Sequence, residues 1–357
     1  MKPFNSNFTK IETFIKLDRQ PDFDNLLKVL ERKKPSRPTL FEYFMCDEIY
    51  DALTRHLDYD SSDELKASKK MIDAFRIAGY DYATIPGSDF NFPCNNHNMG
   101  GSKTISINKG YVITDRESFE NYDWPDPESF DYSRLEYLGS YLYKGMKLLV
   151  TDNDGLLESV IRLVGYDNLC FMLMEDPELV NDIFFEVGSR LSKYFEICSG
   201  YNSVGGCISG DDWGFNSQTM FSPKDLRKYL FPWHKKMVKI IHSAGKKAIL
   251  HSCGNLTSVF DEIIDDIKYD GKHSYEDKIL PIEEAYEQYS SRISLLGGMD
   301  LDFICRSSPE EVYNRAAAIL TKSATRGSYA LGSGNSIPYY VPQENYLAMI
   351  AAAVMNA

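Results

Sequence analysis

Short apolar runs alternate with longer stretches of helical periodicity along most of this chain. Each run is followed by a segment whose apolar residues recur at helical spacing. The eight runs lie at residues 37–44, 80–85, 146–151, 203–209, 246–251, 269–273, 293–298 and 328–332. Regular alternation of strand and helix is typical of a parallel sheet. Eight such units that close on themselves form a (β/α)8 TIM barrel, and this is the α/β fold that we predict.

The main alternative is an open, doubly wound parallel sheet. No Gly-x-Gly-x-x-Gly motif opens the first predicted helix, no Walker A loop occurs, and no repeat has a fixed period. Such glycine-rich loops are the phosphate-binding signature of doubly wound folds. Their absence favours the barrel.

The predicted elements suggest a short N-terminal extension before the barrel. Residues 1–36 are expected to form a helical layer, and residues 37–357 the barrel itself. Within the barrel, residues 87–130 interrupt the alternation after the second strand. Two alternating runs, at 104–107 and 111–114, predict a β-hairpin in this insertion. A connection of this length is often a lid or a docking element.

Composition narrows the classes of function. The chain has 357 residues, of which 43% are hydrophobic and 25% charged, as expected of a globular protein. Its net charge of −13 argues against nucleic acid or an anionic membrane as a partner. The seven cysteines are scattered, with no Cys-x-x-Cys pair, and no apolar run approaches 18 residues. We therefore expect a reduced, cytoplasmic protein.

Polar or ionisable side chains follow every predicted strand. In a (β/α)8 barrel this end of the strands forms the active site. The residues are Glu42, Ser88 or Asp89, Asp152 and Asp154, Asp211 and Asp212, His251 and Cys253, His273 and Glu276, Asp300, and Ser333 and Asn335. Unpaired charges are costly to bury together, so the cluster needs a metal, a cationic substrate or mutual pairing.

His251 and Cys253 are the strongest candidates for metal ligands. Residues two apart on a strand point to the same face, and zinc prefers imidazole and thiolate ligands. An isolated pair of this kind is more often a hydrogen-bonded histidine and an inert thiol, but the barrel mouth favours metal. The options for a third ligand are Asp211, Glu276, His273, Asp300 and Cys207. His234 is expected to be a helix-surface or core residue.

Several motifs together resemble one known family. They are His-Ser-Cys-Gly-Asn at 251–255, Gly-Gly-Met-Asp at 297–300, Gly-Ser-Gly-Asn-Ser-Ile at 332–337 and Asp-Asp-Trp-Gly at 211–214. The combination resembles the uroporphyrinogen decarboxylase superfamily, and within it the cobalamin (corrinoid)-dependent methyltransferase branch. The likeness extends over most of the chain from about residue 37. It implies a (β/α)8 barrel, the fold predicted independently above.

The resemblance also implies a zinc site. In this branch zinc is held by His-x-Cys, which matches His251 and Cys253, and by a later cysteine in a Gly-Cys-Gly context. Here the third position is Ser333, so the last thiolate is missing. Replacement of a thiolate by a carboxylate or water makes zinc a stronger Lewis acid, which favours a methoxy substrate over a thiol.

We assign roles on this basis. Glu276 is expected to complete the set of Zn²⁺ ligands. Asp211 and Glu276 are expected to be catalytic residues, each either as a further metal ligand or as a group that orients the ligands. The corrinoid is expected on a separate partner protein, because no Asp-x-His-x-x-Gly motif occurs. The residues expected to contact substrate are Asp212, Trp213, Asp300, Ser333 and Asn335. The oligomeric state is left open, with a homodimer as one option.

Two other functions are kept as alternatives. Uroporphyrinogen decarboxylase itself uses N-terminal arginines to hold the carboxylates of its tetrapyrrole. The corresponding stretch here, 40–46, contains no arginine, and the predicted mouth is acidic. The other alternative is a non-catalytic barrel that binds a small ligand.

Overall fold

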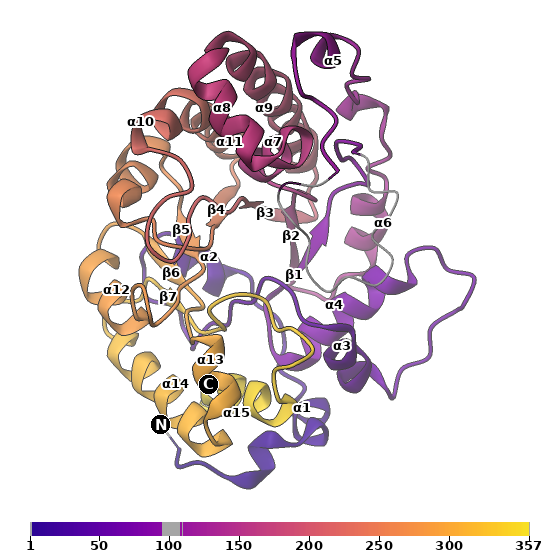
Figure 1. The fold of residues 1–357 in the computed structure, drawn as a ribbon. Coiled ribbons are helices and arrows are strands. Elements are labelled where there is room, and N and C mark those ends of the chain that lie inside the picture. Colours follow the sequence, from indigo (N-terminus) through magenta and orange to yellow (C-terminus); the bar gives the residue numbers. More distant parts are fainter. Residues whose placement is uncertain (1, 95–107, 109, 357) are drawn as a thin grey trace.

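The computed structural model describes residues 2–94, 108 and 110–356 (Figure 1). Seven parallel strands form one sheet in chain order. They are β1 (Tyr82–Pro86), β2 (Lys147–Thr151), β3 (Val204–Gly210), β4 (Lys247–His251), β5 (Gly271–His273), β6 (Ser294–Leu296) and β7 (Tyr329–Ala330). The sheet curls around the centre of the molecule with helices outside it (Figure 1). The α/β, TIM-barrel-like architecture is therefore confirmed, with seven of the eight predicted strands.

The first predicted strand, 37–44, is present only as a single bridge. Leu40 pairs in parallel with Leu331, at the end of β7. On the side of the segment that faces β1, the backbone N–H of Glu42 donates to the side-chain hydroxyl of Tyr82 at 2.6 Å. In a strand, this N–H would instead pair with the backbone of β1. Pro38 also lacks the N–H that a ladder requires. The segment thus lies beside β7 without forming a strand.

Helices cover the outside of the sheet. Their bounds are α1 (Ile11–Leu17), α2 (Asp24–Leu30), α3 (Asp47–Thr54), α4 (Lys66–Ala78), α5 (Arg116–Glu120), α6 (Arg134–Tyr141), α7 (Leu156–Val164), α8 (Tyr166–Glu175), α9 (Pro177–Ser199), α10 (Pro223–Asp225), α11 (Phe231–Ser243), α12 (Ile282–Tyr289), α13 (Leu301–Arg306), α14 (Pro309–Ser323) and α15 (Gln343–Val354). Short 3₁₀ turns occur at Ser6–Thr9, Pro127–Ser129 and Thr257–Val259, and π-helical turns at Leu226–Leu230 and Glu262–Ile267. The helices α1 and α2 agree with the helical layer predicted for residues 1–36. The last ten residues of α15 are buried, and this helix packs against α14.

A π-helical turn precedes Pro232 in its helical segment. The π-helical turn Leu226–Leu230 comes directly before α11, and Pro232 takes the second position of α11. A proline has no N–H to donate to the preceding turn. The wider turn accommodates this missing bond, and the helical path continues through it.

The predicted insertion after β1 is described only in part. The first run of the predicted hairpin, 104–107, lies outside the described residues. The second run, 111–114, carries no strand, and the N–H groups of Val112 and Ile113 both donate to the carbonyl of Leu163 in α7. The role of the insertion as a lid or docking element stays a prediction, as does a domain boundary at residue 36.

Within the described part of the chain, no helix combines the length and the apolar character needed to cross a bilayer.

One buried carboxylate ties the end of β3 to two helices. The Oδ1 atom of Asp211 accepts from the backbone N–H groups of Leu157 and Glu158, at the start of α7. Its Oδ2 atom accepts from the indole of Trp213 at 2.8 Å and lies 2.9 Å from Nε2 of His234 in α11. Asp211 therefore accepts hydrogen bonds from donors that would otherwise be buried without partners.

We expect Asp211→Ala to destabilise the protein by about 3 kcal/mol, because it leaves several buried donors unsatisfied. Urea denaturation followed by circular dichroism would measure the free energy of unfolding. The exposed Glu120 provides a matched control, and Glu120→Ala should change that free energy by less than about 0.5 kcal/mol. An equally small change for Asp211→Ala would contradict the structural role given to this carboxylate.

Candidate metal centre

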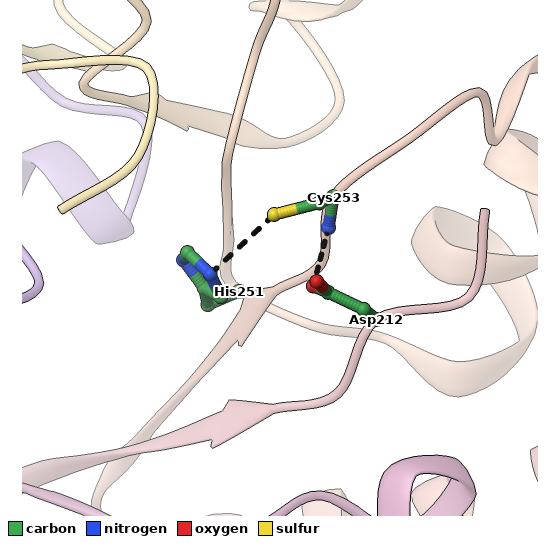
Figure 2. Close-up of side chains that lie close together, drawn as sticks. All are labelled: Asp212, His251 and Cys253. Atoms are coloured by element: carbon green, nitrogen blue, oxygen red, sulfur yellow. Dashed lines mark hydrogen bonds between the residues drawn. The ribbon is translucent and has the colours of Figure 1, made fainter. Parts of the chain in front are cut away.

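Three potential ligands meet at the C-terminal ends of β3 and β4. His251 is the last residue of β4, and Cys253 follows it by two positions. Asp212 stands two positions after the end of β3. One ligand atom from each residue lies within 4.8 Å of the others. In Figure 2 the sulfur of Cys253 points toward the imidazole of His251, at 3.8 Å from Nε2, and the Asp212 carboxylate approaches the same loop.

Hydrogen bonds fix the protonation of His251. The Nε2 atom of His273 lies 3.0 Å from the carbonyl oxygen of Ser333, which only accepts, so Nε2 carries the proton. Burial lowers the pKa of His273 to about 3, so this ring is neutral and its Nδ1 atom is an acceptor. Nδ1 of His251 lies 2.8 Å away and must donate to it. Burial also lowers the pKa of His251 well below its usual value. Its Nε2 atom therefore presents a free lone pair toward Cys253, as a metal ligand requires.

The sulfur of Cys253 sits in a polar setting. The amide Nδ2 of Asn335 donates to it at 3.2 Å. The backbone N–H of Cys253 donates to Oδ1 of Asp212 at 2.7 Å, which holds the carboxylate beside the thiol. Burial, and then the nearby Asp212 charge, raises the pKa of the thiol. A bound cation would reverse this preference and favour the thiolate.

The donor set fits zinc. A neutral imidazole, a thiolate and a carboxylate are the three ligand types that zinc accepts, and three protein ligands leave one position for a substrate or water. Close backbone contact also shapes the loop, since Gly254 has a positive φ of 82° and a Cβ there would lie 2.1 Å from the carbonyl oxygen of Gly214. The turn after Cys253 therefore requires glycine.

A buried lysine accompanies the three ligands, and the sequence pattern did not single it out. Lys272 lies in β5 and is only 3% exposed. Its ammonium donates to the carbonyl of Ser274 and lies 4.4 Å from the centre of the Tyr275 ring. Burial lowers its pKa to about 8, while the Cys253 and Asp212 charges act in the opposite direction. The signal in the sequence that could have identified Lys272 is a lysine inside a strand that is predicted to be buried.

Two of the predicted site residues support the ligands indirectly. Asn335 contacts the sulfur of Cys253, as described above. The carbonyl of Ser333 holds His273, while its hydroxyl donates to Oε1 of Glu42 at 2.6 Å. Burial raises the pKa of Glu42 to about 8. The hydroxyl of Ser333 is therefore bound to Glu42.

The other predicted residues lie apart from the three-ligand group. Asp211 and Trp213 are fully buried in the network at the start of α7. Asp300 caps α13 through the N–H of Phe303 and accepts from the N–H of Asp277. Glu276 lines a small separate hollow together with Lys272. Among the described residues the group contains Asp212, and neither Asp211 nor Glu276 joins it.

A cavity of about 320 Å³ opens beside the three-ligand group. Its lining consists of Tyr43, Phe44, Pro86, Thr151, Asp152, Asn153, Asp154, Glu158, Gly210, Asp212 and His251. The ring of Tyr43 stacks on His251, with centroids 4.3 Å apart. Burial raises the pKa of Asp152 and of Glu158 well above the usual carboxyl range. Tyr43 and Glu158 do not stand at strand ends among the eight candidate positions, and sequence reasoning missed both.

Comparison with known proteins places the chain in a family. The family described as Uroporphyrinogen decarboxylase (URO-D) matches residues 158–354, more than half of the chain. No curated protein sequence gives a significant match.

Among solved structures, a methyltransferase from Methanosarcina mazei is similar, with a TM-score of 0.68 and 16% sequence identity over 92% of this chain and 97% of that chain. An endo-beta-1,4-xylanase from Gloeophyllum trabeum has a TM-score of 0.39 and 11% identity over 64% of this chain and 82% of that chain, which is too low to carry an argument. The likeness to this methyltransferase shows the fold, and the family match extends through the candidate metal centre and the last helix. The chain belongs to the uroporphyrinogen decarboxylase (URO-D) family.

Proposed function

We propose that the protein is a zinc-dependent methyltransferase that moves a methyl group between a small methylated substrate and a separate corrinoid protein. The observation that carries the proposal is the convergence of Asp212, His251 and Cys253 beside a cavity at the ends of the strands. The likeness in fold to a methyltransferase adds support.

The chain's own residues prepare the ligands. His273 keeps the free lone pair of His251 on Nε2, and Asn335 fixes the sulfur of Cys253. Asp212 supplies the carboxylate that replaces the missing third thiolate. When bound by these three residues, zinc would act as a Lewis acid on the oxygen or sulfur of the substrate.

A methoxy compound is the preferred substrate, and a thiol acceptor is the second option. In the methoxy direction the bond between the methyl carbon and its oxygen breaks. The methyl group would pass to the Co(I) form of the partner's corrinoid, which would supply the electron pair of the new bond. The oxygen would keep the pair of the broken bond and take up a proton. A carboxylate gives less electron density to zinc than a thiolate does, which favours polarisation of an ether oxygen.

Uroporphyrinogen decarboxylation is the alternative that the family name suggests. Its substrate carries several carboxylates, and recognition of carboxylates calls for arginine or lysine. The described residues that line the cavity include neither, and they include four carboxyl groups. The cavity thus repels the substrate of the family's namesake.

Purified protein is expected to bind about one equivalent of zinc, and His251→Ala and Cys253→Ala are expected to lose it, because each removes a ligand atom. Metal content measured by mass spectrometry after dialysis tests this. Cys305→Ala provides a control thiol remote from the group and should retain zinc. Equal, negligible zinc in the wild type and the variants would refute the metal site.

His273→Phe is expected to weaken zinc binding by about tenfold to a hundredfold, since the orienting partner of His251 is lost. Competition with a chelating dye measures the affinity. His242→Phe changes a histidine that pairs with Asp270 at the surface, and it should leave the affinity unchanged. An unchanged affinity in His273→Phe would show that the imidazole pair does not position the ligand.

Methyl transfer from a methoxy compound to reduced cobalamin, or from methylcobalamin to a thiol, is expected of the wild type and should fall by at least about a hundredfold in Cys253→Ala. Absorption spectroscopy follows the change in the corrinoid. Decarboxylation of uroporphyrinogen, with no methyl transfer to or from cobalamin, would establish the alternative function.

A further inference from the structure

The cavity beside the candidate metal centre holds more carboxyl groups than the metal ligands explain. Asp152, Asp154 and Glu158 line it in addition to Asp212. Asp154 pairs with Arg162. No ion pair in the described part of the chain involves Asp152 or Glu158, and no lysine or arginine lines this cavity. Even with zinc bound to Asp212, two carboxyl groups would therefore lack an opposite charge.

Asp152 lines the cavity, and one of its carboxylate oxygens is buried without a partner. The residue is only 4% exposed. Its Oδ1 atom accepts from the backbone N–H of Gly210 at 3.0 Å. Its Oδ2 atom is buried and has no hydrogen-bond partner among the described residues. A buried polar atom without a partner is costly, so this oxygen indicates that a ligand with a donor or a positive charge completes the site.

Aromatic rings stand on the other side of the same space. Tyr43 and Phe44 line the cavity, and the ring of Tyr43 is held by stacking on His251 and by a bond of 2.6 Å between its hydroxyl and Thr151. Gly210 leaves room for this arrangement, because a Cβ there would lie 2.3 Å from the Tyr43 oxygen. Aromatic faces together with carboxylates form the usual recognition site for ammonium groups.

We propose that this cavity binds a small organic cation, with its protonated or quaternary ammonium nitrogen at Asp152 and Glu158 and against the rings of Tyr43 and Phe44. The inference rests on the proposed function, since it names the substrate class. The substrate is a methoxy or thiol compound that also bears an ammonium group, and its oxygen or sulfur faces Asp212 and His251.

An organic cation fits the space better than a second metal ion. The volume of about 320 Å³ is that of a small-molecule site, many times the size of a bare ion. In addition, Asp152, Asp154 and Glu158 are not in the one group of potential metal ligands found among the described residues.

The test compares two probes of the same shape and different charge, choline and 3,3-dimethyl-1-butanol. Isothermal titration calorimetry on the full-length, zinc-loaded protein should show choline binding at least about tenfold more tightly than the neutral alcohol. Equal affinity for the two probes, or no binding of choline, would overturn the proposal. Displacement of choline by stoichiometric, tighter binding of Mg²⁺ or Ca²⁺ would also overturn it, because it would show a metal site.

Charge-removing variants locate the binding. Asp152→Asn and Glu158→Gln should each weaken choline binding by about tenfold and leave binding of the neutral alcohol unchanged. Asn at 152 can still accept from Gly210, and circular dichroism verifies that the variants are folded. Glu120→Gln removes an exposed charge and should have no effect. Choline affinity unchanged in both cavity variants would overturn the assignment.

Zinc content and choline binding, measured together, distinguish a failure of the cation site from a failure of the proposed function. Cys253→Ala is expected to lose zinc and methyl transfer but to retain choline binding, because its side chain is not among the residues that line the cavity. Absence of choline binding in a wild type with full zinc and methyl transfer contradicts only the cation site. Choline binding in a wild type that holds no zinc contradicts only the proposed methyltransferase.

Discussion

The parallel register of β3, β4 and β5 is the constraint on which the site depends. Gly210 pairs with His251, and His251 pairs with His273, so three strand ends stop at one level. Residues just beyond these three strand ends therefore lie close together at the C-terminal edge of the sheet. Asp212 and Cys253 each stand two positions past their strand, and this shared offset brings their side chains to the same imidazole. A shift of one residue in either pairing would point a ligand to the other face.

A chain of hydrogen bonds runs inward from His251, at the candidate metal centre. His251 donates to His273, which donates to the carbonyl of Ser333, and Ser333 is in turn held by Glu42. These residues belong to four separate segments of the chain, and all four are buried. Burial keeps both imidazoles neutral, so their tautomers are set by geometry. In the neighbouring cavity, the same low-dielectric setting makes it costly to bury carboxyl groups that have no cationic partner. This cost favours the binding of a positively charged ligand.

Sequence patterns predicted the architecture well because each pattern is local. The strand at 246–251 and its His-x-Cys ending, for example, follow from a short apolar run and a side-chain period of two. The run at 37–44 was also predicted as a strand, yet only Leu40 forms a bridge, to Leu331 directly after β7. The side-chain hydroxyl of Tyr82 accepts the N–H of Glu42 in place of a backbone carbonyl. A competing contact from a residue so distant in the chain cannot be predicted from the local sequence.

The local sequence was enough to set the order of the βα units, the polar strand ends, and His251 with Cys253 as a pair on one face. The choice between neighbouring carboxylates depended on tertiary packing. Asp211 and Asp212 are adjacent and chemically alike, but the chain turns after β3 so that Asp211 caps α7 and Asp212 reaches Cys253. The physical reason is that alternate residues of an extended segment face opposite ways, and only the packing of α7 and α11 fixes which side is buried.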